Sequence, residues 1–218
     1  MIDFYSRAGQ VIRRWPTGQA RTWVTSFLQE AAQSKDVIAV IALGSAVRPD
    51  VPSEDVDLLV LHTGGARLKW RAPIEVDLRG YDMSKLEHDL GLGADLATWG
   101  IMYGVALYDE DGVWERIVDR WRGRLRLPDP DVAEKRAAKA LSQLRVLEEA
   151  GDDAAANELM VSYLTHLARA ALSRAGVFPA SRPELVDQLR SIHQGDLADS
   201  LEAALMARLR LASETTAV

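Results

Sequence analysis

The chain has 218 residues, of which 48% are hydrophobic and 27% are charged, an ordinary composition for a globular protein of one or two domains. Its net charge of -6 and isoelectric point of about 5.3 provide no basic surface for a phosphate backbone, so nucleic acid is disfavoured as a partner. The absence of Cys excludes disulfides, thiolate catalysis and Cys-ligated zinc or iron, and without a signal peptide or a membrane-length apolar run we expect a cytoplasmic protein with no membrane contact.

The first part of the chain alternates helical and strand patterns. The predicted elements are a helix over 21–34, strands over 36–44, 56–62 and 73–81, two short helices within 84–104, a strand over 105–109 and a helix over 112–126. The first strand, "DVIAVIALG", lacks polar alternation, which is typical of a strand buried on both faces. In the third strand, Glu75 and Asp77 share one face and apolar residues the other.

The last part of the chain is helical. After "LPDPD" the β-branched runs stop and Ala and Leu dominate, which predicts domains over residues 1–127 and 128–218. Four helices are predicted, over 132–150, 152–175, 183–192 and 197–211. Asp152 or Asp153 is suited to cap the second helix, Ser181 to cap the third and Asp196 to start the last. The short connections predict an antiparallel bundle. The fold class is therefore α+β: a short mixed sheet with helices, followed by an all-α helical bundle.

Two aspartates, Asp55 and Asp57, open the second strand after a loop of nine residues that follows Gly44-Ser45. Residues i and i+2 of a strand share a face, so the two carboxylates repel each other and raise each other's proton affinity. The arrangement becomes favourable when a divalent cation lies between them, because magnesium prefers hard oxygen ligands. A third carboxylate is available on the third strand from Asp77 or Glu75.

The residues around the loop have a functional and a structural interpretation. Gly44 permits close backbone approach, the Ser45 hydroxyl and adjacent amides can hold a phosphate, and Arg48 can neutralise phosphate charge. Taken alone, "GS" is usually a turn, "EDVD" is usually a solvated strand edge, and Arg48 is equally suited to pair with loop carboxylates at positions 50 and 54. The spacing that joins them to a third acidic strand favours the functional interpretation.

Leu43-Gly44-Ser45 and "DVDL" at 55–58 resemble the signature of the DNA polymerase beta-like nucleotidyltransferase superfamily, which is an apolar residue, Gly-Ser, a loop of similar length and Asp-x-Asp in a strand. "GSAVR" is similar to the GSxxR form of its small bacterial members, and "GIMYGVALYDEDG" is similar to the segment after their third strand. The resemblance covers roughly residues 19–126. It departs from the pattern at Glu54, because family members often have Ser immediately before the first Asp, whereas Ser53 here stands one residue earlier.

The resemblance implies a polymerase beta-like nucleotidyltransferase domain followed by the helical bundle, and a transferase of phosphorus-containing groups. "IEVDLRGYD" resembles the segment that supplies the third acidic residue, which favours Asp77 over Glu75. Two Mg²⁺ ions held by Asp55, Asp57 and Asp77 would bracket the alpha-phosphate of a nucleoside triphosphate, expected to be ATP. Gly44, Ser45 and Arg48 would bind the nucleotide, and a nucleoside monophosphate would pass to an acceptor hydroxyl.

The acceptor is the open part of the prediction. A small nucleotidyltransferase domain followed by a bundle resembles the aminoglycoside nucleotidyltransferases, which implies a small-molecule acceptor. In the bundle, "LEEAGDDAAANELM" gathers carboxylates around one turn that could receive a polyamine-like molecule, or that simply forms a solvated turn favoured by the helix dipole. The candidate acceptor-binding residues are Glu75, Glu148, Glu149 and Glu158.

Two alternative functions stay open at this point. One is a toxin-antitoxin nucleotidyltransferase that modifies a protein or RNA, although the R-x-x-x-x-H ribonuclease signature of the helical proteins found beside such enzymes is missing. The other is a non-catalytic regulatory module that binds a nucleotide, against which the intact acidic pair argues. We also expect a homodimer, in which one subunit closes the cleft of the other.

Overall fold

The computed structural model describes residues 4–48, 55–64 and 70–216. It divides into two compact units, Met1–Arg126 and Leu127–Val218, each with a hydrophobic core of its own. The sequence prediction placed this division one residue later, after residue 127. The fold is α+β, with a mixed sheet and helices in the first unit and only helices in the described part of the second.

The first unit contains a four-stranded sheet with the strand order β3-β2-β1-β4. Strand β1 is antiparallel to both β2 and β4, whereas β2 and β3 are parallel. Its elements are α1 (Phe4–Val11), α2 (Gly18–Ala31), β1 (Val37–Leu43), β2 (Val56–His62), β3 (Val76–Asp82), α3 (Met83–Leu92), α4 (Asp95–Tyr103), β4 (Val105–Asp109) and α5 (Val113–Trp121), with the short 3-10 helices η1 (Ser45–Val47) and η2 (Glu110–Gly112).

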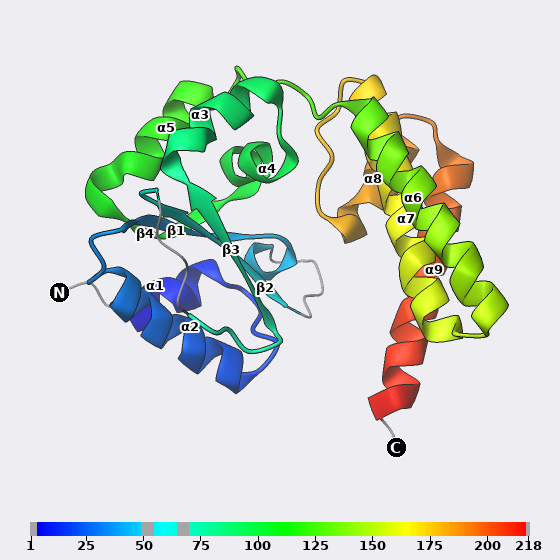
Figure 1. Ribbon diagram of the computed structural model, residues 1–218, viewed down its shortest axis with the longest axis horizontal. Coiled ribbons are helices and arrows are strands. Elements are labelled where there is room, and N and C mark those ends of the chain that lie inside the picture. Colours follow the sequence, from blue (N-terminus) through cyan, green and yellow to red (C-terminus); the bar gives the residue numbers. More distant parts are fainter. Residues whose placement is uncertain (1–3, 49–54, 65–69, 217–218) are drawn as a thin grey trace. The chain divides into compact units, whose positions relative to one another are not determined.

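Helices cover both faces of this sheet, as Figure 1 shows. On one face, α1 and α2 pack against inward-pointing residues of the strands such as Val40 and Val60. On the other face, α3, α4 and α5 pack against Ile41 and Leu59, which are the sequence neighbours of Val40 and Val60. Because strand residues alternate between faces, the two central strands must be apolar on both sides, and the expectation that β1 is buried on both faces is confirmed.

One helix was not predicted. Helix α1 buries Phe4 and Ala8 in the core on the α2 side of the sheet, and Ile12, directly after the helix, is buried in the same core. These residues follow one another at intervals of four, so the helical period is present in the sequence, but a segment of eight residues is too short to be stable without the surface it packs on. Packing against the sheet therefore decides that this segment is a helix.

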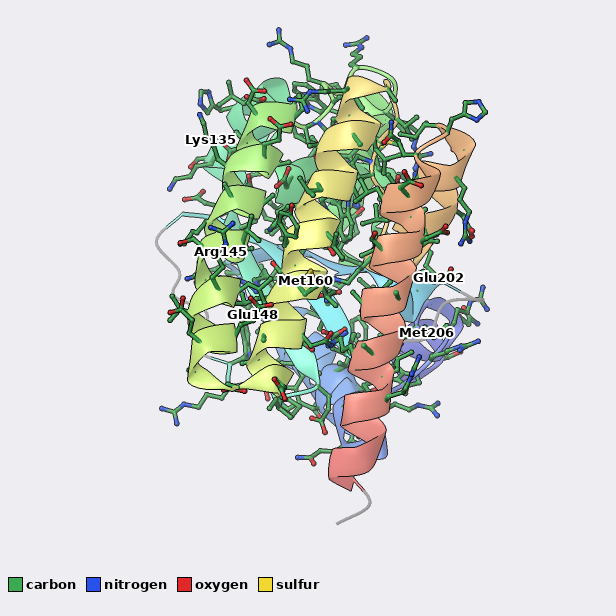
Figure 2. All side chains as sticks on the ribbon, turned by 90° about the vertical axis from the view of Figure 1, so that its right-hand side faces the viewer. Lys135, Arg145, Glu148, Met160, Glu202 and Met206 are labelled. Atoms are coloured by element: carbon green, nitrogen blue, oxygen red, sulfur yellow. The ribbon has the colours of Figure 1, made fainter. Side chains whose placement is uncertain are left out.

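The second unit is built from α6 (Pro130–Ala150), α7 (Asp153–Arg174), η3 (Arg182–Glu184), α8 (Leu185–Ser191) and α9 (Gly195–Thr216). Helix α7 packs against α6, α8 and α9, and Figure 2 shows α6, α7 and α9 side by side. Of the two candidate caps of α7, Asp152 is the one that accepts a hydrogen bond from the Ala155 N–H, at 3.1 Å. The predicted cap Ser181 forms a capping box with Glu184 at η3. None of the described helices combines the length and the apolar character that crossing a membrane requires.

Candidate functional site

Two aspartates on neighbouring strands lie next to each other in the sheet. Asp57 of β2 and Asp77 of β3 are register partners in the parallel pair, and adjacent strands are about 4.8 Å apart. Both residues are half-buried, and Asp55 is exposed immediately before the first residue of β2. Asp57 lies on the same face as Leu59, the face covered by α3, α4 and α5. The sheet therefore brings two like charges together at the ends of two strands.

Gly44, directly after β1, is held against the Asp57 carboxylate. Its backbone has φ 70° and ψ −153°, a combination that only glycine adopts without strain. A Cβ atom at this position would lie 2.2 Å from Oδ2 of Asp57. The cause is the pairing of β1 with β2, in which Leu43 is the register partner of Asp57. Glycine is thus needed here because the chain turns beside a carboxylate.

Ser45 and Arg48 follow this glycine. Ser45 is the first residue of η1, and the Arg48 N–H donates to the Ser45 carbonyl at 3.0 Å, which closes the short helix. The Arg48 guanidinium lies over the ring of Tyr103, with 4.7 Å between its Cζ and the ring centroid. Tyr103 in turn meets Trp99 edge to face at 6.0 Å. Helix α4 therefore supports the Arg48 side chain at the end of the glycine loop.

Arg79 binds one member of the aspartate pair, Asp77. Its Nε and Nη2 donate to Oδ2 of Asp77 at 2.9 and 2.7 Å. The hydrogen bond and the charge of Asp77 raise the pKa of Arg79, and the charge of Asp57 adds to the effect. Asp77 and Arg79 are two residues apart on β3, so both side chains project from the same face.

Sequence reasoning missed both Tyr103 and Arg79. The signal for Arg79 was present, because the i, i+2 spacing in "DLR" predicts that Arg79 and Asp77 share a face. Tyr103 has no local signal, since its contact with Arg48 joins segments that are distant in the sequence.

The predicted metal ligands are only partly assembled. Within residues 4–48, 55–64 and 70–216, no three His, Asp or Glu side chains form a group that could hold a metal ion, and the Asp77 carboxylate is bonded to Arg79. The three-aspartate magnesium site therefore stays a prediction. The suggested pairing of Arg48 with positions 50 and 54, and the departure at Ser53-Glu54, lie outside the described residues.

The candidate acceptor residues lie at separate places. Glu75 is half-buried just before β3, and its carbonyl accepts the Val56 N–H at 2.8 Å. The register partner of Asp57 is Asp77 and not Glu75. Glu148 and Glu149 are exposed in the last turn of α6, where Figure 2 labels Glu148. Glu158 of α7 forms an ion pair with Arg208 of α9.

The comparisons with known proteins add little to this geometry. No family model and no curated protein matches the sequence. A crystal structure of a nucleotidyltransferase-like protein from Exiguobacterium sibiricum 255-15 is 18% identical to this chain. The match covers 88% of this chain and 76% of that one, with a TM-score of 0.36. A TM-score this low does not establish a shared fold, so no function follows from this likeness.

Proposed function

We propose that the first unit catalyses magnesium-dependent transfer of a nucleoside monophosphate from a triphosphate, expected to be ATP, to an acceptor hydroxyl. The observation that carries this proposal is the register pairing of Asp57 with Asp77, with Gly44 held against the Asp57 carboxylate. A pair of like charges on adjacent strands destabilises a sheet unless a cation is recruited to it.

The donor set suits magnesium. Carboxylate oxygens are the hard ligands that this ion takes, together with water and substrate phosphates. Asp57 is fixed by the central strand β2 and Asp77 by the edge strand β3 that pairs with it, which limits how far the two carboxylates can move apart. The guanidinium of Arg79 binds the Asp77 carboxylate, which indicates that positive charge is stabilised at this position. It occupies the place that a metal ion would take.

Each residue would have a distinct role. Asp55, Asp57 and Asp77 would hold the magnesium, which when bound supplies charge neutralisation at the alpha-phosphate and activation of the acceptor hydroxyl. Ser45 and the amides of η1 would hold phosphate oxygens through hydrogen bonds. Arg48, supported on the ring of Tyr103, would pair with the triphosphate and orient it for in-line attack.

For the acceptor, we propose a small cationic molecule that carries a hydroxyl group. Its support is the exposed carboxylate pair Glu148 and Glu149 at the end of α6. Glu158 already has Arg208 as its partner, so a cationic acceptor would have to compete for it. Glu75 is the candidate on the first unit, half-buried beside the first residue of β3.

Release of pyrophosphate tests the proposal. Wild-type protein with ATP and Mg²⁺ is offered aminoglycosides and polyamine-like alcohols, and in separate reactions proteins and RNA. We expect release with a small cationic acceptor and a loss of at least about 100-fold in Asp57→Asn, because removing one group that stabilises charge in a transition state typically costs that much.

Asp119→Asn is the matched control, since Asp119 is an exposed aspartate of α5 in the same unit. It should retain wild-type activity. Equal pyrophosphate release by wild type and Asp57→Asn would contradict the assignment of the site. Pyrophosphate release with only a protein or RNA acceptor would support nucleotidyl transfer and contradict the proposal of a small-molecule acceptor.

A further inference from the structure

We propose that Arg79 is an internal counter-cation of the aspartate pair, which holds Asp77 in the metal-free protein and is displaced from it when a divalent ion binds. The inference rests on the proposed function and adds a regulatory step to it. Metal binding then becomes an exchange of one cation for another on the same carboxylate, and its affinity is set partly by how strongly Arg79 holds Asp77.

The geometry of the pair supports a defined contact. Both donors of Arg79, Nε at 2.9 Å and Nη2 at 2.7 Å, converge on the same oxygen of Asp77, Oδ2. Arg79 is the register partner of Leu59, so its backbone lies two residues along the strand pair from the register pair of Asp57 and Asp77.

The pair is also accessible enough to exchange. The side chain of Arg79 is 64% exposed and that of Asp77 is 40% exposed. An ion pair in contact with water contributes little to stability, because each partner is solvated nearly as well when the two separate. A doubly charged ion that binds several carboxylates can therefore compete with Arg79 for this oxygen, and Arg79 can swing into solvent without leaving a buried charge.

The first test is titration with Mn²⁺ alone, followed by electron paramagnetic resonance. Arg79→Met keeps an unbranched apolar stem and removes the charge and the donors of the side chain. We expect about 2- to 5-fold tighter Mn²⁺ binding than in wild type, the factor that corresponds to the free energy of an exposed ion pair.

Arg120→Met is the matched control for this titration. Arg120 also forms an exposed ion pair in the first unit, with Glu87, and its side chain is 59% exposed. Its removal should leave the affinity for Mn²⁺ unchanged. Equal affinities in wild type, Arg79→Met and Arg120→Met would overturn the inference.

A double-mutant cycle separates direct competition from a general charge effect. If Arg79 acts by occupying Asp77, the gain from Arg79→Met must disappear in an Asp77→Asn background. If the gain persists at full size there, Arg79 acts only through long-range charge, and the exchange is rejected. Arg79→Lys, which keeps the charge but cannot present two converging donors, should bind Mn²⁺ with an affinity between those of wild type and Arg79→Met.

A second measurement, nuclear magnetic resonance of the arginine side chains, uses the wild-type protein alone. In wild-type protein, the Nε–H signal of Arg79 in a nitrogen-15 spectrum should shift on addition of Mg²⁺ as its hydrogen bond to Asp77 is lost, while the Nε–H signal of Arg120 stays in place. An unmoved Arg79 signal at saturating Mg²⁺ would overturn the inference and leave the proposed function intact. Failure of wild type to bind Mn²⁺ or Mg²⁺ at all would overturn both.

Discussion

Carboxylates on the helices of the second unit and carboxylates on the paired strands of the first unit have different surroundings. On the helices of the second unit, acidic residues are spread over the surface and pair with an arginine from a neighbouring helix. These groups are Arg174 with Asp131 and Glu134, Arg190 with Asp199 and Glu202, and Arg208 with Glu158. In the first unit, Asp57 and Asp77 are instead fixed side by side by strand pairing, and Arg79 binds one of them.

The contrast shows how secondary structure decides what acidic residues can do. A helix directs successive carboxylates around its axis, so exposed side chains can each rotate towards a different cation. Paired strands give their side chains one direction and a spacing of about 5 Å, so repulsion cannot be relieved by rotation alone. Carboxylates of the first kind serve solubility and helix packing. Those of the second kind favour a bound cation, which is the basis of the proposed function.

The largest expected effect concerns the glycine beside the aspartates. Gly44→Ala introduces a Cβ atom 2.2 Å from Oδ2 of Asp57 and forces alanine to adopt φ 70°. We expect a loss of about 2 to 4 kcal/mol in the free energy of unfolding, from backbone strain and the forced displacement of the carboxylate together. Urea unfolding measures the loss, and magnesium should no longer raise the melting temperature.

Gly123→Ala separates these two causes. Gly123 also has a positive φ, 87°, but a Cβ atom there would meet nothing within 4 Å. Its substitution should cost only about 1 kcal/mol of backbone strain and leave the response to magnesium unchanged. If both variants lose the same free energy, the contact between Gly44 and Asp57 is not what requires glycine.

The next prediction concerns the role of Arg48 and of Tyr103, the ring beneath its guanidinium. Arg48→Ala should weaken triphosphate binding by about 1 to 3 kcal/mol, the cost of a lost hydrogen bond to a charged group. Tyr103→Leu removes the ring under the guanidinium and should weaken binding by about 0.5 to 1 kcal/mol, because Arg48 keeps its charge but loses its support. Calorimetry measures both. Additive losses in the double variant would show that Tyr103 does not act through Arg48.

A smaller effect on triphosphate binding is expected from the acidic turn of the second unit. Charge reversal of Glu148, Glu149 and Glu158 to lysine should abolish binding of a cationic acceptor while triphosphate affinity stays within about a factor of two, because none of the three residues belongs to the group of Gly44, Asp57 and Asp77. Calorimetric titrations with each ligand distinguish the two affinities. Full transfer activity in this variant would show that the turn is a solvated surface and does not bind the acceptor.

The smallest effect belongs to the ion pairs between helices. Arg208→Met removes the half-buried partner of Glu158 and should lower the free energy of unfolding by about 0.2 to 1 kcal/mol. Because this pair has no part in metal binding, the loss should be equal in magnesium and in chelator. A loss that depends on magnesium would break the contrast between the two kinds of carboxylate.

Much of the fold could be predicted from the sequence because its local patterns are strong. The apolar run of β2 is bounded by Asp55 and by "TGG", and its predicted limits, residues 56 and 62, agree with the structure. Helix α9 runs from Gly195 to Thr216 and exceeds the predicted range of 197–211 at both ends, since Ala-rich and Leu-rich sequence gives no clear stop.

The site could be predicted only in its parts. A third carboxylate on a neighbouring strand was expected, but the register that pairs Asp57 with Asp77 depends on how β2 and β3 align over their whole length. The close approach of Gly44 follows from a second alignment, that of β1 with β2. The contact of Arg48 with Tyr103 depends on the packing of α4, which no local pattern encodes.

The most direct test of the account is the binding of ATP measured by calorimetry in magnesium and in chelator. The account predicts that wild-type protein binds ATP with Mg²⁺ and that binding falls by at least about tenfold in EDTA, because the carboxylates then repel the phosphates that the metal would bridge. Asp57→Asn should lose this dependence on magnesium while keeping its fold by circular dichroism. Wild-type binding of equal strength in magnesium and in EDTA would contradict the assignment of Asp55, Asp57 and Asp77 as a metal site.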